Sequence, residues 1–128
     1  MSRQGMIGAG QHATDLPGFR SVAEAEHSLF ASRDRALKEL FALPELQRAL
    51  DYRPESLNLL EQWFFASGQP VALATGFSVV QAIGFYLGEV CCWHSGFKWL
   101  VQEFVLSPGH YELCVSRAPM TILLTFYH

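Results

Sequence analysis

Charged side chains are scarce in this 128-residue sequence, and this scarcity argues against a nucleic-acid-binding protein. Only 16% of the residues are Asp, Glu, Lys or Arg, against roughly 25% in an average soluble domain. The net charge is -3 and the nine Lys and Arg residues are scattered. Nucleic-acid affinity depends mainly on Lys and Arg that neutralise phosphates. We therefore expect no nucleic-acid partner.

The sequence also lacks the features that direct export. Residues 1–18 contain no apolar core of a signal peptide. Their Gly and polar content predicts a flexible tail, followed by a single α+β domain over 19–128. Three cysteines cannot all pair within one chain, and adjacent cysteines bond each other only with strain. A reducing, cytoplasmic location is the expectation.

One apolar stretch, residues 71–92, has about the length of a transmembrane helix. It contains Gln81 and Glu89, and a carboxylate in the bilayer centre is costly. No Lys or Arg closely flanks the stretch to set an orientation. We expect a buried helix and no membrane span.

The N-terminal part of the sequence predicts four helices. Ser21 and Glu24 have the spacing of a capping box, so a first helix begins here and ends near Leu43, before a proline. A short second helix is predicted over 44–51 and a third from Pro54 to the glycine at position 68. The fourth, over 77–94, is apolar nearly all round and is expected to lie at the centre of the domain.

After residue 96 the pattern changes to three β-rich runs, 97–106, 110–117 and 120–127. Pro108 and Gly109 suit the central positions of a type II turn between the first two. Short links predict an antiparallel meander, so helices come first and a sheet last, which is an α+β fold. The last run ends without a polar tail, which is compatible with a longer natural protein.

The segment "GEVCCWHSGFKW" places two cysteines, a histidine and a glutamate close together. Cys91 and His94 share a helix face, but Cys92 points about 100° away and no C-x-x-C pair is present, so the segment lacks a complete ligand set. A thiol near the C-terminal end of a helix is also a poor nucleophile, because the helix dipole disfavours the thiolate. We predict no metal, no cofactor and no catalytic residue here, with both cysteines reduced and substantially buried.

Two arrangements of acidic side chains leave an enzyme or ligand-binding domain as an alternative. Glu89 with His94 or His110 is a candidate set for a pocket between the central helix and the sheet. Glu89, Glu103 and Glu112 also converge if the helix lies over the sheet, and buried carboxylates of that kind can exchange protons.

The run "GFYLGEV" followed by "GFKW", within residues 84–105, resembles small bacterial α+β domains, several groups of which look like toxin-immunity proteins. The resemblance implies that Tyr86 and Trp99 clamp the helix to the sheet. It also implies that Glu89 bonds strand backbone or faces a ligand. The "CCWH" that follows departs from the basic residue often found there, so no catalytic set transfers.

The leading hypothesis is a non-catalytic binding protein, most plausibly an immunity protein that neutralises a co-encoded bacterial toxin. The aromatic-rich composition and the mild acidity favour a protein partner with a basic site. The predicted contact residues lie on or beside the third helix: Trp63, Phe65, Glu55 and Glu61. A homodimer is the alternative assembly.

Overall fold

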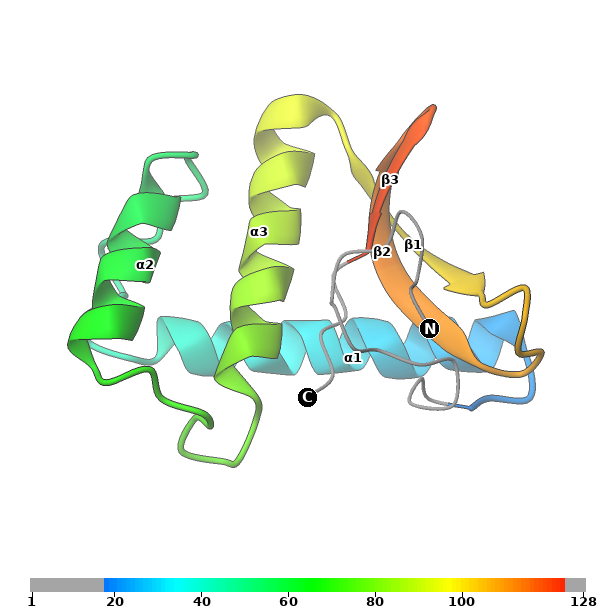
Figure 1. Cartoon of the computed structure of the whole chain (residues 1–128), viewed down its shortest axis with the longest axis horizontal. Coiled ribbons are helices and arrows are strands. Elements are labelled where there is room, and N and C mark those ends of the chain that lie inside the picture. The colour runs from blue at the N-terminus through cyan, green and yellow to red at the C-terminus, as the bar shows by residue number, and fades with distance from the viewer. Residues whose placement is uncertain (1–17, 124–128) are drawn as a thin grey trace.

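The computed structural model describes residues 18–123, which form three helices followed by a three-stranded sheet (Figure 1). This order confirms the predicted α+β class. The predicted tail up to residue 17 and the end of the last predicted strand, 124–127, lie outside the described residues. The elements are α1 (Val22–Phe41), α2 (Ser56–Ala66), α3 (Val79–Ser95), β1 (Lys98–Glu103), β2 (Tyr111–Arg117) and β3 (Met120–Leu123).

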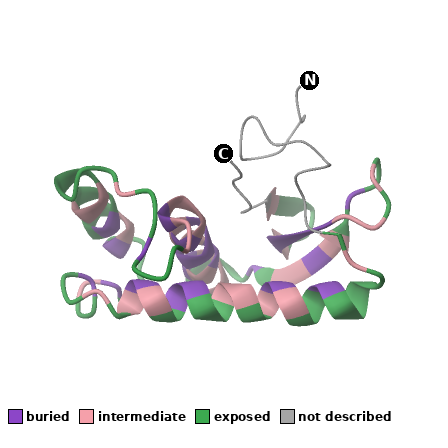
Figure 2. Cartoon of the chain, turned by 90° about the horizontal axis from the view of Figure 1, so that it is seen from below, coloured by how far each residue is buried: buried purple, intermediate pink, exposed green. Residues whose placement is uncertain are grey.

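Helix α1 begins where the capping box predicts. The Ser21 hydroxyl accepts a hydrogen bond from the Glu24 amide at 3.1 Å, and the Glu24 carboxylate accepts one from the Arg20 amide at 3.3 Å. One stripe of the helix is buried, consisting of Ala25, Leu29, Ala36, Leu37 and Leu40. This stripe faces α3 and the sheet, which lie side by side along α1 (Figure 2).

The predicted short helix over 44–51 is wrong. This segment forms a series of hydrogen-bonded turns, including bonds from the Leu46 and Leu50 amides to the carbonyls of Leu43 and Leu46. An isolated helix of about eight residues is only marginally stable, so its conformation follows its tertiary contacts. Here Leu46 and Leu50 are buried in the main core, and Tyr52 ends the segment with a φ of +66°.

Helix α3 crosses α1 and then leads directly into the sheet (Figure 1). The Ser78 hydroxyl accepts from the Gln81 amide at 3.2 Å at its start. Gly96 ends it with a φ of +71°, a left-handed conformation that glycine adopts without the steric penalty of a side chain. Because Lys98 follows two residues later, α3 and β1 are held close together.

The sheet has the order β1-β2-β3 with antiparallel pairing throughout. The predicted type II turn is supported, because Gly109 has a φ of +87° and the His110 amide donates to the Ser107 carbonyl at 3.1 Å. Central strand β2 is buried from Tyr111 to Val115. The main core joins α1, α3 and the sheet, and a smaller cluster around Phe97 and Val115 lies near the end of α3.

Candidate functional site

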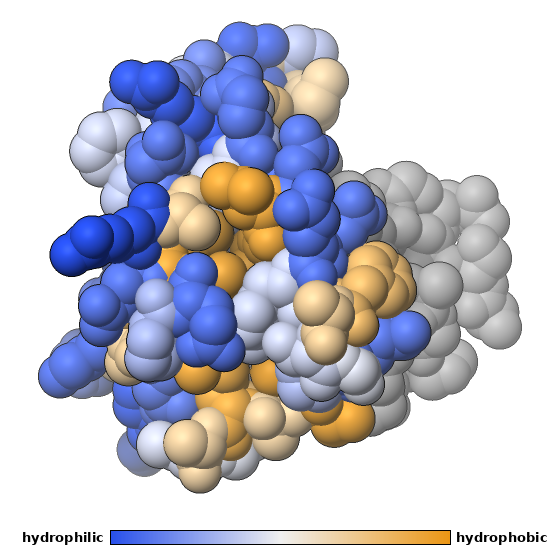
Figure 3. Space-filling model, turned by 90° about the vertical axis from the view of Figure 1, so that its left-hand side faces the viewer, coloured by the Kyte–Doolittle hydropathy of each residue, from blue (hydrophilic) through white to orange (hydrophobic). Residues whose placement is uncertain are grey.

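An apolar groove of about 420 Å³ lies between α2 and α3. Seven apolar side chains and one carboxylate line it. On the side of the molecule that carries α2, hydrophobic side chains are exposed between hydrophilic ones (Figure 3). The lining residues, hereafter the α2–α3 groove, are Leu57, Leu60, Glu61, Phe64, Phe65, Val80, Ile83 and Leu87.

Helical periodicity explains why these side chains form two facing stripes. Leu57, Glu61 and Phe65 follow one another at four-residue intervals along α2, so they share a face. Val80, Ile83 and Leu87 recur three and four residues apart on α3. Most of the groove residues are half-buried, Leu60 is fully buried, and Phe65 keeps 57% of its surface exposed.

Glu61 is the single charged group of the groove. Within residues 18–123 no ion pair or hydrogen bond joins its side chain to another residue. Moreover, the sequence has no Lys or Arg between Arg53 and Lys98, a stretch that contains both groove helices and three glutamates. This part of the domain therefore carries apolar and acidic side chains but no Lys or Arg.

Two of the four predicted contact residues belong to this groove and two do not. Phe65 and Glu61 line it, as an exposed aromatic and a nearby carboxylate. Trp63 is half-buried against the main core, and its indole Nε1 is buried with no hydrogen-bond acceptor among the described residues. Glu55 is exposed at the N-cap of α2, outside the lining. Sequence reasoning missed the contribution of α3, although its apolar residues have the right spacing.

Glu89 links α3 to the sheet through a side chain. Its Oε2 accepts a hydrogen bond from the Trp99 indole Nε1 at 2.7 Å. The resemblance implied that Glu89 bonds strand backbone or faces a ligand, and the bond that the structure shows is to a side chain of β1. The Arg33 guanidinium of α1 lies 5.2 Å from the ring centroid of Trp99 and 4.8 Å from that of Phe30. The cation–π contact with Trp99 therefore joins α1 to the indole on β1.

Tyr86 does not clamp the helix to the sheet. Its hydroxyl accepts from the Tyr52 amide at 2.9 Å and lies 2.5 Å from the Ser56 Oγ, so it ties α3 to the segment that leads into α2. Tyr52 in turn stacks on Trp93 with ring centroids 4.9 Å apart and an interplanar angle of 6°. Burial, followed by the charge of Glu89, raises the pKa of Tyr52.

The predicted pocket pairs Glu89 with either His94 or His110, and within residues 18–123 no hydrogen bond or ion pair joins Glu89 to either histidine. His94 is exposed near the end of α3, where β1 begins. His110 lies beyond the other end of β1, in the turn before β2, and its Nδ1 is 2.8 Å from the Ser107 hydroxyl. Since a strand rises about 3.3 Å per residue, the six residues of β1 place the two histidines about 20 Å apart. Neither the α2–α3 groove nor the cavity beside Glu112 described below is lined by Glu89, His94 or His110.

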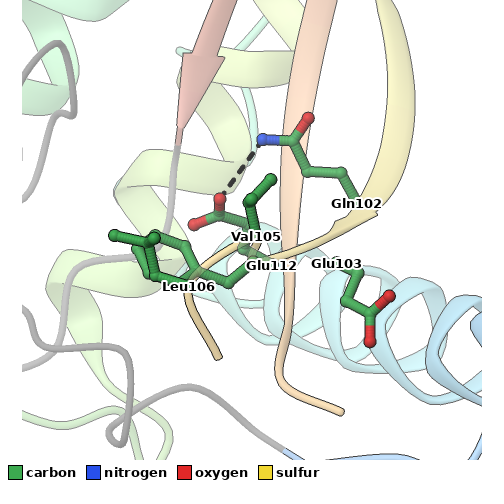
Figure 4. Close-up of a pocket in the computed structure, with 6 residues that line it drawn as sticks. Gln102, Glu103, Val105, Leu106 and Glu112 are labelled. Atoms are coloured by element: carbon green, nitrogen blue, oxygen red, sulfur yellow. Dashed lines mark hydrogen bonds between the residues drawn. The ribbon is translucent and has the colours of Figure 1, made fainter. Parts of the chain in front are cut away.

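The three carboxylates do not converge either. Glu112 is buried on β2 and accepts a hydrogen bond from the side-chain Nε2 of Gln102 at 3.2 Å (Figure 4). Glu103 is exposed and accepts a hydrogen bond from the Gly109 backbone amide at 2.7 Å. Because successive side chains alternate across a strand, Gln102 and Glu112 face the side of the sheet opposite to Trp99 and Glu89. A cavity of about 280 Å³ lies at Glu112, bordered by the residues in Figure 4 and Phe104.

The three cysteines are free thiols, but they differ in burial. Cys114 is fully buried, while Cys91 and Cys92 are half-buried against the smaller core cluster, so the prediction that both adjacent cysteines are buried is only partly right. The C-terminal turn of α3 extends away from α1, which explains the difference (Figure 1). Burial raises the pKa of Cys91, burial together with Glu89 raises that of Cys92 to about 11, and burial raises that of Cys114 to about 12. All three are poor nucleophiles near neutral pH.

Within residues 18–123, no group of three or more His, Cys, Asp or Glu side chains is arranged to hold a metal ion. No helix there is both long and apolar enough to cross a membrane.

These features define an α+β domain whose distinctive surface is an apolar groove between two helices. The chain belongs to the family of the uncharacterised protein YwmA, whose family model matches residues 18–127. No curated protein and no solved structure matches the chain.

Proposed function

We propose that this chain is a non-catalytic protein-binding domain whose partner docks in the α2–α3 groove. The observation that carries the proposal is the half-exposed apolar lining, contributed by both helices, with Phe65 at its edge. The cores of protein interfaces are apolar, rich in aromatic residues and poor in charge. An active site needs several convergent polar groups, and this groove has one carboxylate.

The finer form of the proposal is that the partner is a co-encoded bacterial toxin, which the domain neutralises by covering a basic surface. The resemblance of the region within residues 84–105 to immunity-type domains supports this form, as does the net charge of -3. Glu61 beside the groove supplies acidic complementarity at the docking surface itself.

Co-expression with the neighbouring open reading frame of the source organism tests both forms. The neighbouring product is expressed alone, with this chain, and with two variants of it. Ile83→Glu places a charge in the groove, and Val22→Glu is its matched control on an exposed residue at the first position of α1. That end of α1 and α2 lie at opposite ends of the molecule (Figure 1).

The expected result is that the wild type and Val22→Glu form a purified stoichiometric complex with the product and relieve its toxicity, whereas Ile83→Glu does neither. A complex without any toxicity of the partner would support the binding domain and refute the immunity form. A complex that tolerates Ile83→Glu would refute docking in the groove.

A further inference from the structure

We infer that the α2–α3 groove receives an amphipathic helix whose apolar stripe is bordered by a Lys or Arg. This inference rests on the proposed function and specifies which element of the partner is bound. Three properties of the groove carry it: its length, its two-stripe lining and the position of Glu61.

The length of the groove fits about two turns of a helix. Leu57 and Phe65 are eight residues apart on α2, and Val80 and Leu87 are seven apart on α3. At 1.5 Å per residue, each stripe extends about 10–12 Å. A partner helix with apolar residues at i, i+3 or i+4, and i+7 presents anchors over the same length.

The lining favours a helix over an added strand. Both walls of the groove are helices whose backbone groups bond within the helix, so the groove offers no unpaired strand edge to an extended peptide. Its apolar side chains instead form ridges on two sides, into which a third helix can pack.

Glu61 selects the charge of the occupant. It lies between Leu57 and Phe65 on the same face, so a helix seated in the groove covers or borders its carboxylate. A neutral or acidic occupant removes water from that charge without replacing the lost interaction. A Lys or Arg beside the apolar stripe pairs with the carboxylate, and no cation within residues 18–123 already does so.

The probes for this inference are three synthetic peptides of about 18 residues with the same leucine stripe. The remaining positions are mainly lysine in the first peptide, glutamine in the second and glutamate in the third. Affinities for the purified full chain are measured by titration calorimetry at low and physiological salt. Glu61→Lys reverses the groove charge, and Glu26→Lys is the matched control, since it makes the same net charge change on an exposed residue of α1.

The expected result is that the lysine peptide binds the wild type about tenfold more tightly than the glutamine peptide, with a preference that weakens as salt rises. Glu61→Lys should abolish that preference and favour the glutamate peptide, while Glu26→Lys should change it about twofold or less. Ile83→Glu should prevent binding of every peptide.

The results that would contradict this inference differ from those that would contradict the proposed function. If the peptides bind equally, with Ile83→Glu blocking all of them and Glu61→Lys matching Glu26→Lys, the charge rule is overturned and docking in the groove stands. If no peptide binds, or if binding survives Ile83→Glu, this inference is overturned, while docking of the partner in the groove is decided by the co-expression experiment. Self-association of the chain that Ile83→Glu abolishes would identify the occupant as a second copy and overturn the basic-helix inference.

Discussion

Replacing Tyr86 by phenylalanine removes one hydroxyl from a buried junction of three segments. Ser56 Oγ donates its single proton to the Arg53 carbonyl at 2.6 Å. The 2.5 Å contact between the two hydroxyls is therefore a bond that Tyr86 donates to Ser56. The Tyr86 oxygen also accepts from the Tyr52 amide. Phenylalanine keeps the ring, which is 0% exposed, and loses both bonds.

The expected cost follows from the groups left behind. An unsatisfied, partly buried Tyr52 amide costs about 1–3 kcal/mol, and the lost hydroxyl–hydroxyl bond adds about 0.5–1.5 kcal/mol. Together these contributions lower the expected free energy of unfolding of Tyr86→Phe by about 1.5–4.5 kcal/mol. This is a large part of the total of about 5–15 kcal/mol for a domain, but it leaves the protein folded.

Urea denaturation followed by circular dichroism measures this cost. Tyr111→Phe is the matched control, because Tyr111 is equally a buried tyrosine but makes no hydroxyl hydrogen bond within residues 18–123. It should cost under about 0.5 kcal/mol. Combining Tyr86→Phe with Ser56→Ala should cost about 1 kcal/mol less than the sum of the two, because both remove the same bond. Equal effects of Tyr86→Phe and Tyr111→Phe would refute the role of the hydroxyl.

Four further outcomes are expected. Trp99→Phe removes the donor to Glu89 and should cost about 1–2 kcal/mol in urea denaturation, with Glu89→Gln costing less because it keeps an acceptor oxygen. The pKa of Cys92 rises from its ordinary 9.0 to about 11 on folding. The folded state thus holds a proton that the unfolded state releases, and the free energy of unfolding should fall as pH rises from about 9 to 11; a Cys92→Ala profile as steep as that of the wild type would contradict this assignment. Phe65→Ser should change stability by less than about 0.5 kcal/mol and weaken partner binding in calorimetry, since the ring is mostly exposed. Cys114→Ser should cost about 1–3 kcal/mol and Cys92→Ser less, because only Cys114 is fully buried; equal unfolding midpoints would count against this ranking.

Local sequence signals predicted the parts of the fold that depend on local chemistry. The Ser21 cap, the glycine at position 68 that follows α2 and the Pro108–Gly109 turn each depend on a few neighbouring residues, and each is present in the structure. The segment 44–51 failed because its conformation is decided by where Leu46 and Leu50 are buried, which involves residues distant in sequence.

The candidate site was only half predictable for a related reason. Aromatic and acidic residues on or beside the third helix were predicted as contacts from composition and charge, and two of them, Phe65 and Glu61, line the groove. Helix α3 is apolar nearly all round, and periodicity cannot show which face of such a helix is covered. Val80, Ile83 and Leu87 on the groove side, and the half-exposure of Cys91 and Cys92, follow from tertiary packing.

The shallow burial of α2 makes it a separate unit of local unfolding. Of its 11 residues only Ser56 and Leu60 are buried, whereas α3 buries seven of 17. Detaching α2 should therefore take less free energy than global unfolding, and its amide hydrogens should exchange with solvent earlier than those of α3. Such an opening removes one wall of the groove. If a partner docks in the groove as proposed, it should slow exchange in α2 selectively, because part of its binding free energy goes into keeping that helix closed.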